Sequence, residues 1–462
     1  MNHDDLLHWS KHAADWAHEY HTTLRTRPVR APLNKGASAA LLSKSPPNDP
    51  EPMSEIFADF ERIVPAGMTH WQHPRFFAYF PANAAPASML AEQLCNAIAA
   101  QGMIWQSAPV ATEMEEVMMS WLAQALGLPA HFNGTIHDSA TTATLSAVLT
   151  MREAALNWQG LSAGLSGQKR LRLYTSAQAH SSVDKATRIA GIGQDNLVKI
   201  PTNPNFSINV DLLEQSILTD QAVGHLPIGL ILVMGGTSIG AMDDIAAAQK
   251  IAAKYNMPVH VDAAWAGSAM ICPEFRPLWG GIDAVQSIVF NPHKWLGAQF
   301  DCAVQFIADP AQQIRTLGLR PSYLQTQGAH EPVNFNEWTV PLGRRFRALK
   351  LWFLVRAYGI TGLQALIRNH VRWAQELCAM IEGLGPYHIT SHPRLSLFSF
   401  AHEQGDQATA DLLERINNEG RIYLTQTQHE GRFVIRVQVG QFDCTRDDVM
   451  MIAQVLRDFA PT

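Results

Sequence analysis

Several features are scarce or missing in this sequence, and each absence narrows the function. The 462 residues include only five cysteines, which are scattered and lack CxxC spacing, so we expect reduced thiols rather than a disulfide framework or a metal site. No P-loop or GxGxxG motif occurs, which removes the usual nucleotide-binding alternatives. No apolar run approaches membrane-spanning length, and the first ten residues lack the apolar segment of a signal peptide.

Positive charge is also in short supply. Lysine and arginine number 35 against 41 acidic residues, which gives a net charge of −6. Without a basic stripe to neutralise phosphates, neither a nucleic acid nor an anionic membrane is an expected partner. The hydrophobic content of 47% and the charged content of 16% predict a soluble globular protein with an extensive core, and the length suits two or three domains. The scattered cysteines add the expectation of a cytoplasmic location.

The stretch with the most chemistry is Gln286–Gly297, QSIVFNPHKWLG, a short apolar run that breaks at Pro292. It reads as a buried strand that ends in His293, Lys294 and Trp295. A lysine on a tight turn between an imidazole and an indole can be desolvated enough to act as a neutral amine, which Schiff-base chemistry requires. Most lysines are solvated surface cations, so the interpretation depends on a partner upstream.

That partner is Val259–Ser268, VHVDAAWAGS, which predicts a strand ending at Asp262 followed by small residues. Small residues there leave room for a flat ring, and Asp262 and Ala264 point to the same side if the strand continues that far. A carboxylate held there can pair with a protonated ring nitrogen, as a pyridinium electron sink requires. The alternative is that Asp262 only caps the next helix.

Three segments now carry a resemblance: VDAAWAGSAMICPEF, SIVFNPHKWLGAQFDCA and PLGRRFRALKLWF. They closely resemble segments of the pyridoxal-phosphate-dependent aromatic L-amino acid decarboxylases, and the likeness runs from about Asp5 to the C-terminus. It implies an α/β enzyme of fold type I, like aspartate aminotransferase, that binds pyridoxal 5'-phosphate. It also implies a homodimer with shared active sites, in which an N-terminal arm clasps the partner.

The periodicity of the chain fits that fold. An amphipathic helix is expected over Asp4–Leu24, and the strands expected between Leu171 and Ala308 are LRLYT, LVKIP, GLILVM, PVHVD, AVQSIVFN and CAVQFIA. Their alternation with helices predicts a mostly parallel sheet with helices on both faces and ligands at the strand ends. We expect an N-terminal helical arm over residues 1–84, a cofactor-binding α/β domain over 85–360 and a small α+β domain over 361–462.

The cofactor site is expected at these strand ends. Lys294 would hold pyridoxal phosphate as an internal aldimine while Asp262 keeps the ring nitrogen protonated. The resemblance makes His180, in AHSSVDKA, the residue that stacks on one ring face, with Ala264 on the other. It also favours Ala140 and Thr141 as phosphate contacts at a helix N-terminus, although ordinary N-capping explains Ser139 or Thr141 equally well. The remaining cofactor candidates are Thr237, Asn291 and His293.

The substrate side is carried over from the resemblance. Residues of HWQHPRFFAYFP line that side of the site in the family, although core packing is the alternative for most of these rings. Tyr323 matches the loop tyrosine that delivers a proton to Cα in the family, with a buried structural tyrosine as the alternative. Arg344 and Arg345 are expected at the partner subunit or at the mouth of the site, with ordinary surface arginines as the alternative. The substrate candidates are Trp71, Tyr79, Phe80, Pro81, Ala82 and Met103.

The expected reaction is decarboxylation of an aromatic L-amino acid, such as tryptophan, phenylalanine, tyrosine or DOPA, to the amine. An aminotransferase would break the Cα–H bond instead, and the family's aldehyde synthases commonly replace the loop tyrosine or the stacking histidine. Tyr323 and His180 are both present here, which favours the amine. A catalytically silent scaffold would be expected to lose Lys294 or Asp262, and both are retained.

Overall fold

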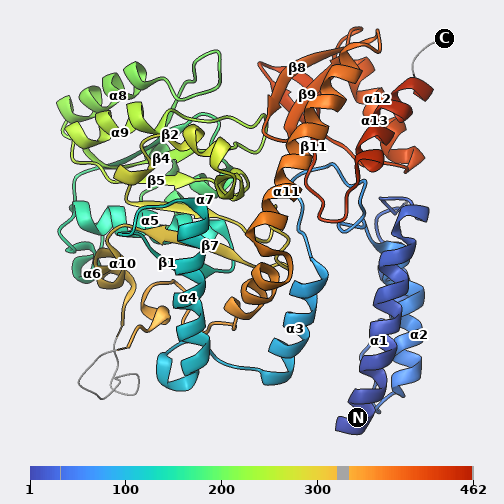
Figure 1. Ribbon diagram of the computed structural model, residues 1–462. Coiled ribbons are helices and arrows are strands. Elements are labelled where there is room, and N and C mark those ends of the chain that lie inside the picture. Colours follow the sequence, from blue (N-terminus) through green and yellow to red (C-terminus); the bar gives the residue numbers. More distant parts are fainter. Residues whose placement is uncertain (32, 320–331, 460–462) are drawn as a thin grey trace. The chain divides into compact units, whose positions relative to one another are not determined.

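The structure is a computed structural model that describes residues 1–31, 33–319 and 332–459 (Figure 1). The chain forms two compact units. The first contains Met1–Pro81, Trp373–His392 and Phe398–Thr462, and the second contains Ala82–Arg372 and Pro393–Leu397. The division expected from the sequence, into an N-terminal arm up to residue 84, a cofactor-binding domain up to residue 360 and a small C-terminal domain, stays a prediction.

The second unit is built on a seven-stranded sheet in the order β1-β7-β6-β5-β4-β2-β3. Its strands are β1 (Asn133–His137), β2 (Leu171–Ser176), β3 (Leu197–Ile200), β4 (Leu226–Val233), β5 (Val259–Asp262), β6 (Ser287–Phe290) and β7 (Ala303–Ile307). Strands β3, β2, β4, β5 and β6 pair in parallel, whereas β7 runs antiparallel to both β6 and β1. The prediction of a mostly parallel sheet is therefore confirmed.

The expected strands are all present, and the sheet contains one more. Residues Asn133–His137 form β1, which is not among the strands expected from the sequence. The five residues NGTIH include a glycine and three polar side chains, so they lack the apolar run of a central strand. Pairing with β7 and burial of Gly134–His137 on the sheet override that weak local signal.

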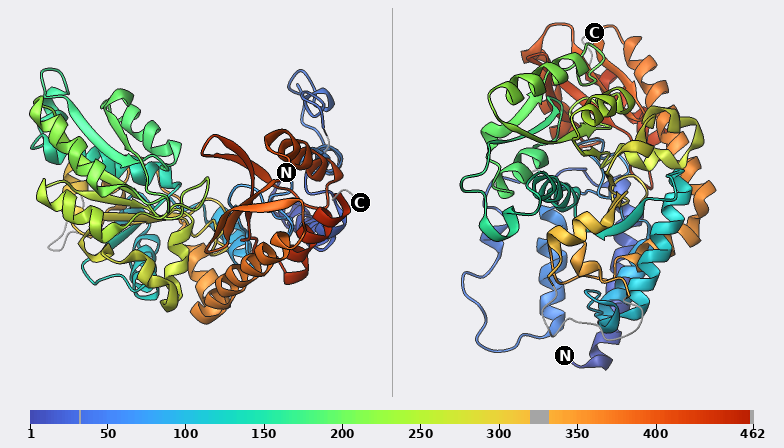
Figure 2. Two further views of the ribbon diagram at one scale, coloured as in Figure 1. Left: turned by 90° about the horizontal axis from the view of Figure 1, so that it is seen from above. Right: turned by 90° about the vertical axis from the view of Figure 1, so that its left-hand side faces the viewer.

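Helices lie on both faces of this sheet (Figure 1, Figure 2), as expected for parallel strands that are buried on both sides. Local sequence explains several of their ends: α4 starts with Pro109, α5 is capped by the Ser139 side chain, and Gly127 at φ +73° ends α4. Apart from α11 (Ala348–Glu382), the helices of this unit are α3 (Pro86–Ile98), α4 (Pro109–Leu126), α5 (Ala140–Ala155), α6 (Gly160–Ala163), α7 (Ser181–Ile189), α8 (Val210–Ala222), α9 (Ile245–Lys254) and α10 (Pro310–Leu317).

Helix α11 (Ala348–Glu382) leads from the second unit into the first and is interrupted at Gly359, whose φ is +64°. The first unit adds a four-stranded sheet in the order β10-β11-β9-β8. Its other elements are α1 (His3–Thr23), α2 (Met53–Ile63), β8 (Tyr387–Arg394), β9 (Leu397–His402), α12 (Asp406–Glu419), β10 (Thr425–His429), β11 (Arg432–Gln438) and α13 (Arg446–Phe459).

The aromatic stripe of α1 packs against α2. Trp9 stacks on Phe57 with ring centroids 5.5 Å apart, and Trp16 meets Phe60 at 4.8 Å. The apolar stripe read from the sequence thus has a partner helix in its own chain, and dimerisation through this arm stays a prediction. Among the residues that the structure describes, no helix combines the length and the apolar character needed to cross a membrane.

Candidate active site

The carboxyl ends of β1, β2, β4, β5 and β6 lie at one edge of the sheet, because these strands share a direction. The register aligns the last residues of neighbouring strands: Val233 of β4 pairs with Asp262 of β5, which pairs with Val289 of β6. Each strand then continues into a loop that carries predicted site residues. This is the edge at which open α/β sheets bind ligands.

Asp262 is the last residue of β5, and its side chain is buried, with 8% exposed. Its carboxylate oxygen Oδ1 accepts the backbone N–H of Ala264 at 3.1 Å. The short helix that follows begins after Trp265 and has no side-chain cap, so Asp262 does not act as a helix cap. Because the strand ends at Asp262, the expected alternation that would put Asp262 and Ala264 on one side does not apply. Ala264 itself is half-buried.

The lysine lies in the loop that follows β6, directly beside the Asp262 loop. The N–H of Asn291 donates to the carbonyl of Ala264 at 2.8 Å, and the N–H of Lys294 donates to the carbonyl of Asn291 at 2.9 Å. Lys294 is half-buried. The predicted convergence of acid and amine is therefore a consequence of two adjacent parallel strands.

His293 and Trp295, the neighbours of Lys294, are both buried and both anchored. The Nδ1 atom of His293 accepts the N–H of Cys302 at 2.8 Å, and burial lowers the pKa of His293 to about 3, so the ring is neutral. Trp295 donates its indole N–H to Nδ1 of His370 at 3.0 Å and stacks on Trp265, with centroids 4.9 Å apart. These contacts fix the backbone on both sides of the lysine.

The stack of Trp265 on Trp295 also joins the loop after Asp262 to the loop that carries Lys294. Trp265 follows Ala264 directly, and Trp295 follows Lys294 directly, and both indoles are fully buried. A shift of one loop therefore disturbs the other, since buried aromatic contacts are closely packed. Sequence reasoning named Trp295 only as a neighbour of the lysine and missed Trp265.

Asn83 is a second residue that sequence reasoning missed. Its side-chain amide donates to the carbonyl of Lys294 at 2.5 Å, and its backbone N–H donates to the carbonyl of His293 at 2.9 Å. Asn83 is fully buried and lies 211 residues before the lysine. No local pattern could have paired the two, because the contact joins distant parts of the chain.

His180 follows β2 and caps α7. Its Nδ1 accepts the N–H of Ser182 at 3.1 Å, so in the neutral ring the proton resides on Nε2. Partial burial lowers the pKa of His180, the Asp262 carboxylate opposes that shift and Lys294 adds to it. The imidazole therefore lies within electrostatic range of both the acid and the amine, and the structure brings these three predicted residues together.

The first turn of α5 lies at the same edge. Ser139 caps the helix by accepting the N–H of Thr142, which leaves the first helical N–H groups, those of Ala140 and Thr141, without partners inside the helix. Ordinary capping thus accounts for Ser139 but not for Thr141. The carboxylate of Asp138 accepts the hydroxyls of Ser139 and Thr142, a feature that the sequence reading did not consider.

These residues fit the phosphate and ring of pyridoxal phosphate. Asn291 is 4% exposed, and its Oδ1 has no hydrogen-bond partner among the described residues, so a polar side chain is left at this edge for a ligand. Helix N–H groups suit the phosphate, and the acid, amine and imidazole are the groups that the ring requires.

Thr237 is half-buried in the turn that follows β4. The turn depends on Gly235, whose φ is +84° and whose added Cβ would lie 2.5 Å from the Cβ of Ala266. A Cβ at Gly236 would lie 3.2 Å from the Cβ of Ala241. The carboxylate of Asp243 accepts the N–H of Val233, the last residue of β4, at 2.7 Å and so holds the start of the turn in place.

The aromatic substrate candidates belong to the first unit. Trp71 stacks on Tyr79 with centroids 5.7 Å apart, and both are partly exposed, at 37% and 48%, whereas Phe80 and Pro81 are buried. Core packing therefore suits Phe80 better than it suits Trp71. The other two candidates, Ala82 and Met103, are half-buried residues of the second unit. Substrate contact by all six stays a prediction.

Two further expectations have different outcomes. Tyr323 lies outside the described residues, so its proton-donor role stays a prediction. Arg344 is not a surface arginine, since it is 5% exposed and donates to the Glu115 carboxylate at 2.5 Å. A carboxylate that neutralises the arginine makes its burial acceptable, and contact with the site mouth or the partner subunit stays a prediction. Arg345 pairs with Glu92.

Comparisons with known proteins agree with this geometry. The conserved domain of pyridoxal-dependent decarboxylases matches residues 36–403. The chain is 36% identical to the aromatic-L-amino-acid decarboxylase of Cavia porcellus over 474 aligned residues, which cover 100% of this chain and 98% of that protein.

Two solved structures are similar over nearly the whole chain. The crystal structure of Oryza sativa TDC with PLP and tryptamine matches with a TM-score of 0.96 at 32% identity, covering 99% of this chain and 98% of that one. The 4-hydroxyphenylacetaldehyde synthase of Rhodiola rosea matches with a TM-score of 0.92 at 32% identity, with the same coverage.

Proposed function

The chain belongs to the pyridoxal-dependent decarboxylase family, and from this premise we propose that it converts an aromatic L-amino acid into the corresponding amine and carbon dioxide. As a carboxy-lyase it depends on pyridoxal phosphate. When bound, the cofactor supplies an electron sink for the negative charge left at Cα as carbon dioxide departs. The choice of an aromatic substrate rests on the relatives, which include an aromatic-L-amino-acid decarboxylase.

One observation carries the assignment of roles: Asp262 ends β5, Lys294 follows β6 and His180 follows β2, and these parallel strands end at one edge of the sheet. Three groups from the ends of β2, β5 and β6 thus surround one space. Lys294 would hold the cofactor covalently, Asp262 would hold a proton at the ring nitrogen, and His180 would stack on the ring. The Oδ1 of Asn291 and the N–H groups of Ala140 and Thr141 would face the phosphate.

The neutral state of the neighbouring imidazole supports this division of labour. His293 stays uncharged because burial lowers its pKa to about 3, so it adds no positive charge beside the Lys294 amine. The Nδ1 of His180 accepts the N–H of Ser182, which leaves Nε2 as the protonated nitrogen of the neutral ring. In this proposal Thr237 donates to the ring hydroxyl or to the substrate carboxylate, and Tyr323 returns the proton to Cα.

The test is covalent attachment at Lys294. The purified holoenzyme should show a visible absorbance band that borohydride abolishes, and peptide mapping after reduction should find the cofactor on Lys294. Lys294→Ala should retain pyridoxal phosphate only non-covalently, while the control Lys199→Ala, at a partly exposed lysine paired with Asp184, should behave like the unmodified protein. Reduction that fixes the cofactor to another lysine would overturn the assignment.

The homodimer with shared active sites and the cytoplasmic location remain part of the proposal. Size-exclusion chromatography with light scattering would test the first. A mixing experiment would test the second: Lys294→Ala is combined with another inactive variant, one changed at a residue that a subunit contributes to its partner's site. Recovery of activity in the mixture would indicate that the sites are shared between subunits.

A further inference from the structure

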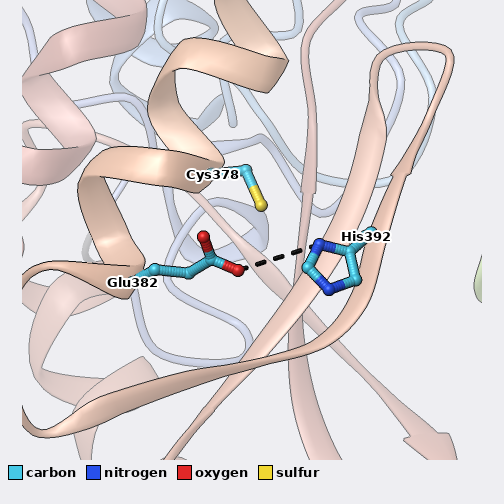
Figure 3. A group of neighbouring side chains, drawn as sticks. All are labelled: Cys378, Glu382 and His392. Carbon is cyan, nitrogen blue, oxygen red and sulfur yellow. Dashed lines mark ion pairs between the residues drawn. The ribbon is translucent and has the colours of Figure 1, made fainter.

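Three potential metal ligands meet in the first unit, away from any residue assigned above to the cofactor. Cys378 and Glu382 lie on α11, and His392 lies on β8 (Figure 3). The sulfur, a carboxylate oxygen and an imidazole nitrogen all lie within 4.8 Å of one another. The Oε1 of Glu382 is 3.8 Å from the Nδ1 of His392. Of the residues that the structure describes, this is the group found with such spacing.

The fold explains why they meet. Cys378 and Glu382 are four residues apart, so one helical turn puts them on the same face of α11. The chain then turns through residues 383–386, and β8 returns along the end of the helix with His392 facing both side chains (Figure 3). The site is thus formed by one short connection and needs no distant part of the chain.

The three donors match one class of ion. Thiolate, carboxylate and imidazole are ligands of zinc and similar transition metals, whereas calcium and magnesium prefer oxygen alone. A tetrahedral zinc ion with its usual bond lengths needs ligand atoms roughly 3.3–3.6 Å apart. The recorded 3.8 Å between Glu382 and His392 is close to that spacing. A thiolate and a carboxylate would also balance the two positive charges of the ion.

Ordinary packing is the alternative reading of the same residues. Cys378 is 4% exposed and belongs to a hydrophobic cluster with Leu377 and Ile381, and the ion pair of Glu382 with His392 is exposed and of small energetic value. That reading does not explain why a carboxylate lies beside the thiol. The carboxylate oxygen of Glu382 and an imidazole nitrogen of His392 both lie within 4.8 Å of the Cys378 sulfur.

We propose that Cys378, Glu382 and His392 bind one zinc-like transition metal ion per chain, with the fourth coordination position open to water. The bound ion would clip the end of α11 to β8 and so stabilise the first unit. The site is independent of the proposed decarboxylase activity, and neither proposal depends on the other. It revises the expectation from cysteine spacing that the chain has no metal site.

Cobalt binding to the reduced, metal-stripped holoenzyme tests the proposal, because tetrahedral cobalt with a thiolate ligand absorbs at longer wavelengths than the cofactor. We expect these bands to saturate at one equivalent per chain and to disappear when zinc is added. His392 is 77% exposed, so His392→Ala should fold normally and should weaken cobalt binding at least tenfold. Cys378→Ser should abolish the bands.

The matched control is His388→Ala, since His388 is also on β8 and its side chain points to the same face as His392. This variant should bind cobalt like the unmodified protein. Zinc should also raise the thermal midpoint of the unmodified protein and of the control but not that of His392→Ala. Absence of the bands, or equal cobalt affinity in the His392 and His388 variants, would overturn the proposal.

Discussion

Mild acid should destabilise the second unit, because three of its histidines are buried in the neutral form. Burial lowers the pKa of His137 and His293 to about 3 and that of His260 to about 4, whereas an unfolded chain has a histidine pKa near 6.5. A histidine whose pKa is lowered by folding contributes its full stability above the unfolded pKa. That contribution is lost as the pH falls towards the folded pKa.

The magnitude follows from these values. At about pH 5, proton uptake by the unfolded chain costs the folded state roughly 2 kcal/mol for each histidine, or about 6 kcal/mol for three. Asp243 acts in the opposite direction, because burial raises its pKa to about 7. Its protonation between neutral pH and about pH 5 returns roughly 2.5 kcal/mol. The expected net loss is roughly 3.5 kcal/mol, a large part of a typical unfolding free energy.

Urea unfolding followed by tryptophan fluorescence at about pH 7.5, 6 and 5 measures this loss. His260→Asn isolates one contribution, since in the described part of the chain the His260 imidazole bonds to two side-chain hydroxyls, those of Ser287 at 2.7 Å and Thr144 at 3.4 Å. The variant should be less stable than the unmodified protein near neutral pH, and the two unfolding free energies should approach each other by about 2 kcal/mol as the pH falls. Parallel pH profiles for the two proteins would refute the reasoning.

Two further changes probe the supports of the site. Asn83→Ala removes the amide that donates to the Lys294 carbonyl at 2.5 Å, so the free energy of unfolding should fall by about 1–3 kcal/mol. The variant should also lose pyridoxal phosphate faster during dialysis. Retention of the cofactor equal to that of the unmodified protein would contradict this role of Asn83. Gly235→Ala adds a Cβ that lies 2.5 Å from Ala266 at a φ of +84°, whereas Gly224→Ala has a φ of +83° and no atom within 4 Å. Gly224→Ala is therefore the control and should lose only about 1–2 kcal/mol of unfolding free energy, the cost of a left-handed backbone at alanine. Equal thermal midpoints for the two variants would contradict the close packing at Gly235.

The sequence was most informative where strands are buried on both faces. GLILVM is a continuous apolar run and PVHVD a short valine-rich segment, and they form β4 and β5 with Leu230–Val233 and Val259–Asp262 buried. The acid and the lysine could be located because each follows such a run. The edge strand β1 was missed, since NGTIH shows no run and only its pairing with β7 makes it a strand.

Residues that support the site were much harder to find. Asn83 reaches the lysine loop across 211 residues, and Trp265 looks like an ordinary core indole until its stack with Trp295 is seen. Likewise, His392 follows Cys378 on a different element, so only the fold brings it to the thiol. Such contacts depend on tertiary packing, and local periodicity carries no record of them.

The most direct test of the central claim is the product formed by the holoenzyme from aromatic L-amino acids. Incubation with tryptophan, phenylalanine, tyrosine or DOPA should release carbon dioxide and the matching amine in equal amounts, with no turnover by Lys294→Ala. Formation of an aldehyde or a 2-oxo acid in place of the amine would contradict the account, because those products come from an oxidative reaction or from transfer of the amino group.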